Sequence, residues 1–208
     1  MTKDLQPFKV DRLQAIEELG AFRKLLDGSP SKILNEREHI LPFFRKNQHL
    51  AAMIGAANSK ISRFDRIGFE FSIQGDFNCD LVVGDSVKHQ YCFVEFENAA
   101  PNSVFSRKLG KSTPEWGSRF EHGYSQIIDW FRALHGMEGT PKYQQMFGMN
   151  EIHFLGMLVI GRRDFMDQDQ ISRLEWRREH VTVFSKKINC ITFDELYDDL
   201  RFRLEEYA

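Results

Sequence analysis

The runs Cys79-Asp80-Leu81-Val82-Val83-Gly84 and Gln90-Tyr91-Cys92-Phe93-Val94-Glu95-Phe96-Glu97 decide the fold of this chain. Both are rich in β-branched and aromatic residues, which favour strands. The polar stretch 85–89 between them predicts a tight connection, so the two strands pair as an antiparallel hairpin. If the hairpin is centred on this stretch, Asp80 lies directly across from Glu95, with their Cβ atoms about 5 Å apart.

A further strand and two helices are predicted before this hairpin. Apolar and polar residues alternate over residues 68–74, and Gly75-Asp76 then signals a turn, so three strands follow one another in meander order. Residues 10–27 have an amphipathic helical pattern that stops at Gly28-Ser29-Pro30. Asn35, followed three residues later by Glu38, predicts the cap of a second helix.

Helices and strands also alternate after the hairpin. A long helix is predicted by an apolar stripe of Phe120, Tyr124, Ile127, Ile128, Phe131 and Leu134. Residues 152–160 predict a strand, 169–178 a helix and 181–185 a short strand, and Thr192 with Glu195 predicts the cap of a last helix. The fold class is therefore α/β (α+β), with a mixed central sheet and flanking helices. Small and polar residues at 55–62 mark the clearest boundary, which predicts an N-terminal helical extension over residues 1–60, including the first core helix, and a main domain over residues 61–208.

The composition is that of an ordinary globular protein with a substantial core. The chain is 42% hydrophobic and 28% charged, and its longest apolar stretch is too short to cross a bilayer. Its start lacks the apolar segment of a secretory signal, so we expect a cytoplasmic protein without a membrane partner. A formal charge of −2 argues against a surface that is basic throughout. Cys79, Cys92 and Cys190 are odd in number and form no CxxC pair, which predicts buried free thiols.

Three carboxylates are predicted to converge at the hairpin. Strand side chains alternate, so Glu97 points to the same face as Glu95, while Val94 and Phe96 point to the buried face. Like charges repel, and such a cluster is stable when it is protonated or holds a divalent cation; oxygen ligands suit Mg²⁺ or Mn²⁺. The same spacing is also typical of a capping Asp80 and a solvated edge strand.

The residues resemble the D…ExK core of the PD-(D/E)xK, restriction-endonuclease-like superfamily. The carrying residues are Gly75-Asp76-Phe77-Asn78-Cys79-Asp80 with Leu81-Val82-Val83-Gly84, then Phe93-Val94-Glu95-Phe96-Glu97-Asn98-Ala99. With the helical segments 36–44 and 120–130, the chain more specifically resembles the C-terminal domain of the Shedu anti-phage proteins over residues 35–183. The resemblance implies an αβββαβ core, a nuclease-like domain in residues 61–208, DNA as partner, and a homo-oligomer.

The resemblance also implies roles for individual residues. Asp80 and Glu95 would be ligands of Mg²⁺ or Mn²⁺, Gln126 would support the site from the following helix, and Glu38 would assist the metal. The chain departs from the pattern at Glu97, which stands where the family has a lysine that orients water and stabilises the pentacovalent phosphate.

Four consequences of this departure are open. Glu97 binds a second metal, Lys108 or Lys111 enters from the loop, or His122 or Arg119 supplies the positive group from the helix, and we favour the second metal. The fourth is an inactive site that still binds DNA ends.

The remaining polar patterns each have two interpretations. His122, Gln126 and Asp129 share a helix face that either lines a cleft or is solvated. The loop that holds Arg107, Lys108 and Lys111 before Arg119 is either a phosphate grip or a solvated loop. A second cluster either follows a nucleic-acid backbone or pairs with Asp164, Asp167 and Glu175; it comprises Arg162, Arg163, Arg173, Arg177 and Arg178.

The sequence thus leads to the hypothesis of a Mg²⁺-dependent DNA endonuclease in bacterial anti-phage defence, with an ExE in place of the ExK motif. Its catalytic residues would be Asp80, Glu95, Glu97, His122 and Gln126, and its metal ligands would come from Asp80, Glu95, Glu97 and Glu38. The alternative is a catalytically inactive nuclease-fold module that binds DNA or senses a phage component. A scaffold with an accidental acidic edge is the third interpretation.

Overall fold

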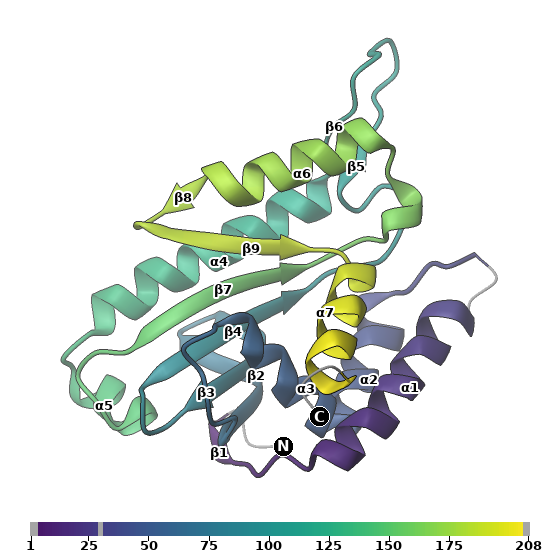
Figure 1. Ribbon diagram of the computed structural model, residues 1–208. Helices are drawn as coiled ribbons and strands as arrows, with labels where there is room; N and C mark the ends of the chain where they lie inside the picture. The colour runs from purple at the N-terminus through teal and green to yellow at the C-terminus, as the bar shows by residue number, and fades with distance from the viewer. Residues whose placement is uncertain (1–3, 29–30, 206–208) are drawn as a thin grey trace.

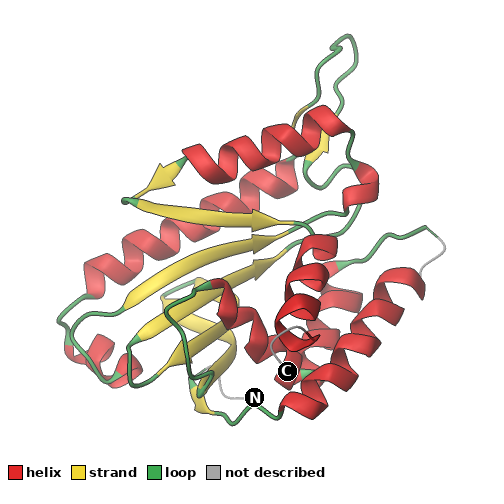
Figure 2. Ribbon diagram, in the orientation of Figure 1, coloured by secondary structure: helices red, strands yellow, loops and turns green. Residues whose placement is uncertain are grey.

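A mixed β-sheet with helices on both faces forms the centre of the protein in the computed structural model (Figures 1 and 2). The structure describes residues 4–28 and 31–205. Within these residues the strand order of the main sheet is β1-β2-β3-β4-β7-β9-β8. The strands are β1 (Gln6–Pro7), β2 (Arg66–Gln74), β3 (Phe77–Asp85), β4 (Gln90–Phe96), β7 (His153–Val159), β8 (Thr182–Val183) and β9 (Lys186–Ile191). Strands β2, β3 and β4 pair antiparallel, whereas β4, β7 and β9 run parallel.

The hairpin register predicted from the sequence is confirmed. Strands β3 and β4 pair Leu81 with Val94 and Gly84 with Tyr91, which is the register that brings Asp80 opposite Glu95. Strand β4 is buried along its whole length, because parallel pairing to β7 leaves it in the middle of the sheet.

One face of the sheet is covered by helices from the two ends of the described chain. These are α1 (Arg12–Gly28), α2 (Leu41–Lys46), α3 (Gln48–Met53) and α7 (Phe193–Glu205), as Figure 1 shows. Phe44 of α2 stacks on Phe96 of β4 with ring centroids 4.6 Å apart, and Phe193 of α7 stacks on the same ring at 6.3 Å. This face therefore shares one apolar core with the N-terminal helices.

The other face is covered by α4 (Ser118–Met137), α5 (Pro141–Phe147) and α6 (Gln168–His180). Helix α4 lies very close to the sheet because glycines stand at the contact. A Cβ on Gly123 would lie 2.7 Å from Leu158 Cδ1, and one on Gly156 would lie 2.5 Å from Ile127 Cγ2. Both distances are shorter than side chains tolerate, so these glycines set the separation between helix and sheet.

The predicted second helix is broken, and its predicted cap is absent. Residues Glu36–Ile40 form a π-helix, and the chain breaks again at Asn47, where φ is −106° and ψ is 66°. Asn35 accepts no capping hydrogen bond; its side-chain amide instead donates to Glu38 at 3.1 Å. The cap of the last helix is confirmed, since Thr192 Oγ1 accepts from Glu195 N at 3.1 Å and Glu195 Oε2 accepts from Thr192 N at 2.7 Å.

Several short elements were not predicted from the sequence. They are β1, β9, α5, the 3₁₀ segments Ile54–Ala57 and Arg163–Phe165, and the small hairpin of β5 (Phe105–Ser106) with β6 (Glu115–Trp116). Strand β9 follows β8 through Phe184 and Ser185, both with positive φ (55° and 58°). Such turns normally contain Asn-Gly or Asp-Gly, so the sequence carried no turn signal here.

The fold class, α/β (α+β) with a mixed central sheet, is confirmed, and so are the three buried free cysteines. The division at residue 60 stays a prediction. No helix among the described residues has the length and apolar character needed to cross a membrane.

Candidate functional site

Three of the acids predicted for the site lie at adjacent ends of β3 and β4: Asp80 in β3, Glu95 in β4 and Glu97 directly after β4. Glu95 is 7% exposed and Glu97 is 1% exposed, while Asp80 is partly exposed. Asp80 Oδ2 accepts a hydrogen bond of 2.8 Å from the backbone N–H of Phe96. This bond takes the place of a ladder bond just beyond the last paired residues, and it anchors the Asp80 carboxylate beside the neighbouring strand.

Helix α4 brings polar and cationic side chains onto the same carboxylates. His122 Nδ1 lies 3.1 Å from Glu97 Oε1, and Arg119 Nη1 lies 3.4 Å from Glu97 Oε2. Gln126 lies close enough to Glu95 to lower the pKa of that carboxyl. The close approach at Gly123, whose Cβ would lie 3.2 Å from Glu97 Cγ, is what allows these contacts. Both oxygens of Glu97 thus contact groups of the helix.

In the N-terminal helical region, Glu36 acts electrostatically on Asp80 and Glu95, whereas the residue predicted to assist the metal is Glu38. Glu38 is exposed and bonded to Asn35. The N–H of Glu36 donates to Asn98 Oδ1 at 2.8 Å, which holds the start of the π-helix against the segment after β4. Glu36 Oε2 then lies 3.9 Å from Arg119 Nη1. The sequence-based expectation assumed α-helical spacing, which does not predict the π-turn that places Glu36, two residues before Glu38, near the other acids. Such π-turns occur often at functional sites.

Burial and mutual repulsion raise the pKa values of these acids. Burial raises the pKa of Asp80 to about 7, against the opposing hydrogen bond from Phe96 and with further repulsion from Glu36 and Glu97. The pKa of Glu95 is raised by burial first and then by Asp80 and Glu97. Burial and the charge of Glu97 also raise the pKa of Glu36. Added positive charge, whether from protons or from a metal cation, therefore stabilises the cluster.

The donor set fits a hard divalent cation. Asp80, Glu95 and Glu36 provide only oxygen atoms, as Mg²⁺ and Mn²⁺ prefer, and the buried Gln126 Oε1 has no hydrogen-bond partner in the structure. In their present rotamers, the described His, Cys, Asp and Glu side chains form no group of three or more that could hold a metal ion. The residues and their charges thus fit a metal, while the coordination geometry is not preformed.

The second basic cluster is engaged in internal ion pairs. Arg162 is buried and binds Asp194 and the Leu26 carbonyl. Arg177 pairs with Glu121 at 2.7 Å, and Arg178 pairs with Glu195 at 3.1 Å. Of the two interpretations, the pairing one holds for these residues, but the partners differ from those expected, because they come from α4 and α7.

Asp129 lies apart from the carboxylates. Its side chain is 49% exposed and faces Arg132 at 4.0 Å. Of the three residues on the helix face predicted to line a cleft, His122 contacts Glu97 and Gln126 lies beside Glu95.

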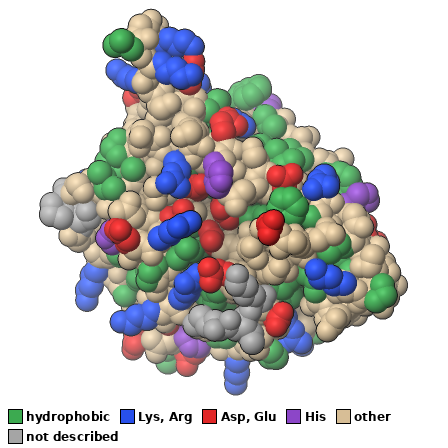
Figure 3. All heavy atoms as spheres, turned by 180° about the vertical axis from the view of Figure 1, so that it is seen from behind, with side chains coloured by type: hydrophobic (Ala, Val, Ile, Leu, Met, Phe, Trp, Pro, Cys, Tyr) green, Lys and Arg blue, Asp and Glu red, His purple; other side chains and the backbone are tan. Residues whose placement is uncertain are grey.

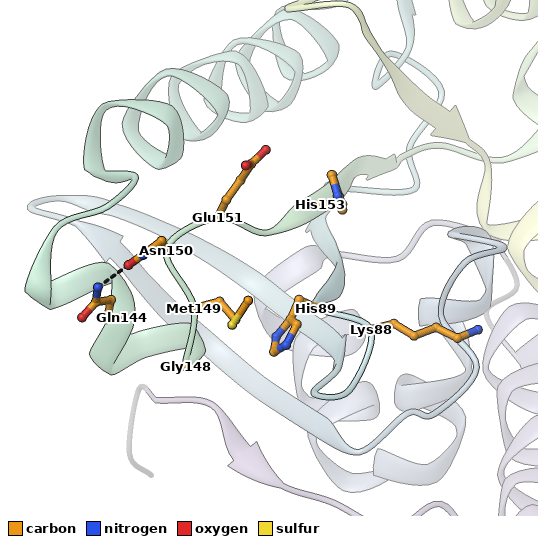
Figure 4. Close-up of a pocket in the computed structure, with 8 residues that line it drawn as sticks. All are labelled: Lys88, His89, Gln144, Gly148, Met149, Asn150, Glu151 and His153. Atoms are coloured by element: carbon orange, nitrogen blue, oxygen red, sulfur yellow. Dashed lines mark hydrogen bonds between the residues drawn. The ribbon is translucent and has the colours of Figure 1, made fainter.

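A separate cavity of about 610 Å³ lies at the opposite end of β4. It is lined by Lys88, His89, Gln144, Gly148, Met149, Asn150, Glu151 and His153. In Figure 4 the Glu151 side chain extends away from His89 and Met149, and Gln144 bonds to Asn150. None of the clustered acids borders this cavity, so the two features are independent.

A comparison with known families finds a match that spans the clustered acids. The family model described as Shedu protein SduA, C-terminal, matches residues 35–197. The chain belongs to this Shedu family. A search of curated proteins finds no match. The matched segment begins just before Glu36 and ends in α7, so it contains every residue of the carboxylate cluster, together with Arg119, His122 and Gln126.

Proposed function

We propose that this Shedu-family protein is a metal-dependent nuclease that cleaves DNA phosphodiester bonds in anti-phage defence. The observation that carries the proposal is the pair Asp80 and Glu95 at the ends of adjacent strands, whose pKa values are raised by burial and by neighbouring carboxylates. Family membership supports the defence role.

Asp80 and Glu95 would hold the cation, with Glu36 in the place that the family resemblance gave to Glu38. Bound there, Mg²⁺ or Mn²⁺ would supply a polarised phosphoryl oxygen and a more acidic water. Gln126 lies beside Glu95, where it would orient the Glu95 carboxylate. Because the acids carry raised pKa values, they release protons as a cation binds.

The contacts of Glu97 support the third of the sequence-based alternatives to the missing lysine. Glu97 holds Arg119 and His122 at the site, and its own oxygens are engaged by them at 3.4 Å and 3.1 Å. A guanidinium presents several donors in a plane and suits phosphate oxygens. Arg119, half exposed, would thus stabilise the charge that develops on the phosphate, and Glu97 is a positioning residue.

Cleavage of supercoiled, linear and single-stranded DNA in Mg²⁺ or Mn²⁺ tests the proposal. We expect the full chain to cut at least one form, and Asp80→Asn and Glu95→Gln to reduce cutting at least about 100-fold, the effect of removing one transition-state contact. Asp129→Asn is the matched control, because Asp129 is a half-exposed acid of α4 that lies apart from the clustered carboxylates and faces Arg132. Equal cutting by all variants, or none by the wild type, would refute it.

The rival function is a nuclease-fold module that binds DNA without cutting it. The absence of a preformed metal group among the described residues favours this rival. Calorimetric titration with Mn²⁺ separates the two. Binding that is lost in Glu95→Gln supports the nuclease, whereas DNA binding that Mn²⁺ does not affect supports the module.

A further inference from the structure

The β5–β6 hairpin projects from the body of the protein as a narrow arm (Figure 1). Its tip is a tight turn in which Lys111 N donates to Lys108 O at 3.1 Å and Gly110 has φ +82°. Leu109 stands in this turn with its side chain fully exposed. Figure 3 shows Lys and Arg side chains beside a hydrophobic side chain at the end of the arm. The tip of the arm thus presents one fully exposed apolar side chain next to cationic ones.

The base of the arm is held by aromatic stacking. Phe105 and Trp116 stack across the hairpin at 4.5 Å, and Trp116 stacks on Phe120 of α4 at 4.6 Å. Arg173 lies over Phe105 at 4.7 Å and donates to the carbonyl of Pro114 at 2.9 Å. The arm is therefore fixed relative to the first turn of α4, which carries Arg119 and begins directly after β6.

The charges of the arm are positive and only partly neutralised. Lys108 and Lys111 both pair with Glu115, and Arg107 has no acidic partner among the described residues. The arm from Arg107 to Glu115 thus carries three cations against one carboxylate. This excess complements phosphates, which bind Lys and Arg with release of counterions.

We propose that this arm is a DNA wedge: Leu109 inserts between base steps of duplex DNA while Arg107, Lys108 and Lys111 bind the flanking phosphates. Apolar side chains that enter the minor groove unstack a step and bend the duplex, and cations beside them hold the backbone. A protein partner is disfavoured, because one apolar side chain is far too small for a stable protein interface. The inference rests on the proposed function for its choice of DNA.

Binding and bending in EDTA test the wedge without any cleavage. The probe is a duplex of about 30 base pairs with a donor and an acceptor dye at its ends, measured with the full chain. We expect Leu109→Ser to abolish the change in energy transfer and to weaken binding about tenfold, the scale of one lost unstacking contact. Val87→Ser is the matched control, because Val87 is also an exposed apolar residue in a turn, at the far end of β4.

Substitution of Glu115 gives a gain of function that a merely structural arm would not show. Glu115→Gln frees Lys108 and Lys111, so binding should tighten and its salt dependence should steepen. The wedge is refuted if Leu109→Ser bends and binds DNA like the wild type, if the wild type binds no duplex, or if the Leu109 variant changes only the oligomeric state. A wild type that binds and bends DNA but does not cleave it in Mg²⁺ refutes the proposed nuclease and leaves the wedge standing.

Discussion

The role assigned to Glu97 is best tested by a double-mutant cycle with Arg119. Glu97 Oε2 and Arg119 Nη1 are 3.4 Å apart, which corresponds to an attraction of about 5 kcal/mol at an effective dielectric constant of about 20. Arg119 is 52% exposed, and solvent screening reduces the net coupling of such a pair to about 1 kcal/mol. Loss of that coupling lowers the population of correctly placed Arg119 by somewhat less than about tenfold.

These magnitudes predict an unequal and non-additive pattern. Arg119→Gln removes the cation and should slow single-turnover cleavage of an end-labelled duplex about 100-fold. Glu97→Gln keeps the side-chain volume, releases Arg119 and should slow cleavage about fivefold to tenfold. The double variant should be no slower than Arg119→Gln alone, because the glutamate acts through the arginine.

Metal binding distinguishes this role from direct ligation. If Glu97 only positions Arg119, Glu97→Gln leaves the calorimetric affinity for Mn²⁺ nearly unchanged. Arg132→Gln controls for loss of a positive charge from α4, since Arg132 is exposed and faces Asp129. Additive rate losses together with weakened Mn²⁺ binding in Glu97→Gln would show that Glu97 is a metal ligand and would overturn the positioning role.

Three further predictions follow from the same geometry. Burial raises the pKa of Asp80 to about 7, so the free energy of unfolding in EDTA should fall as pH rises from about 4 through about 7. Titration calorimetry should show that the affinity for Mn²⁺ rises over the same pH range. In denaturant melts, Asp80→Asn should reduce the dependence of the unfolding free energy on pH. Gly123→Ala places a Cβ 2.7 Å from Leu158 Cδ1 and should lower stability by about 1–3 kcal/mol, whereas Gly136→Ala on the same helix meets nothing within 4 Å and should raise it by up to about 1 kcal/mol. Asp85 is buried and accepts from the N–H groups of Ser62, Arg63, Val87 and Lys88 at 2.9–3.1 Å, so Asp85→Ala should lower the free energy of unfolding by at least about 3 kcal/mol in urea melts; an unchanged midpoint would contradict this account.

Asp85 has a separate effect on the stability of the protein at acidic pH. Burial disfavours its charged form, but the hydrogen bonds from Lys88, Ser62 and Arg63 outweigh burial and hold its pKa far below the ordinary value. Its contribution to stability is therefore complete above about pH 4 and is lost as pH falls further. The slopes due to Asp80 and Asp85 thus have opposite signs and occupy different pH ranges.

The strand part of the site could be predicted from the sequence, because strand geometry has few alternatives. Side chains alternate with a period of two, so Glu95 and Glu97 share a face once Val94 and Phe96 are assigned to the core. The short polar turn fixes the register, and the paired residues Leu81 and Val94 agree with it.

The helical part of the site depends on long-range packing that local patterns do not encode. Glu36 reaches the site because Asn98, 62 residues away, accepts from its backbone N–H. The break at Asn47 and the π-turn before it interrupt the period of 3.6 on which the helix prediction relied. Gly123 was readable only as an isolated helical glycine, and its function emerges when β4 and β7 are in place.

A lysine at position 97 and the arginine at position 119 are positioned by different parts of the fold. A lysine at position 97 would be fixed by the central strand β4, whereas Arg119 belongs to the first turn of α4. That turn is stacked, through Phe120 and Trp116, on the base of the arm that carries Leu109. In the proposed nuclease, the cation that serves the phosphate and the arm that binds the duplex therefore belong to one packed unit. DNA that binds at the arm would therefore contact the same packed unit that carries Arg119, to which a strand lysine would not belong.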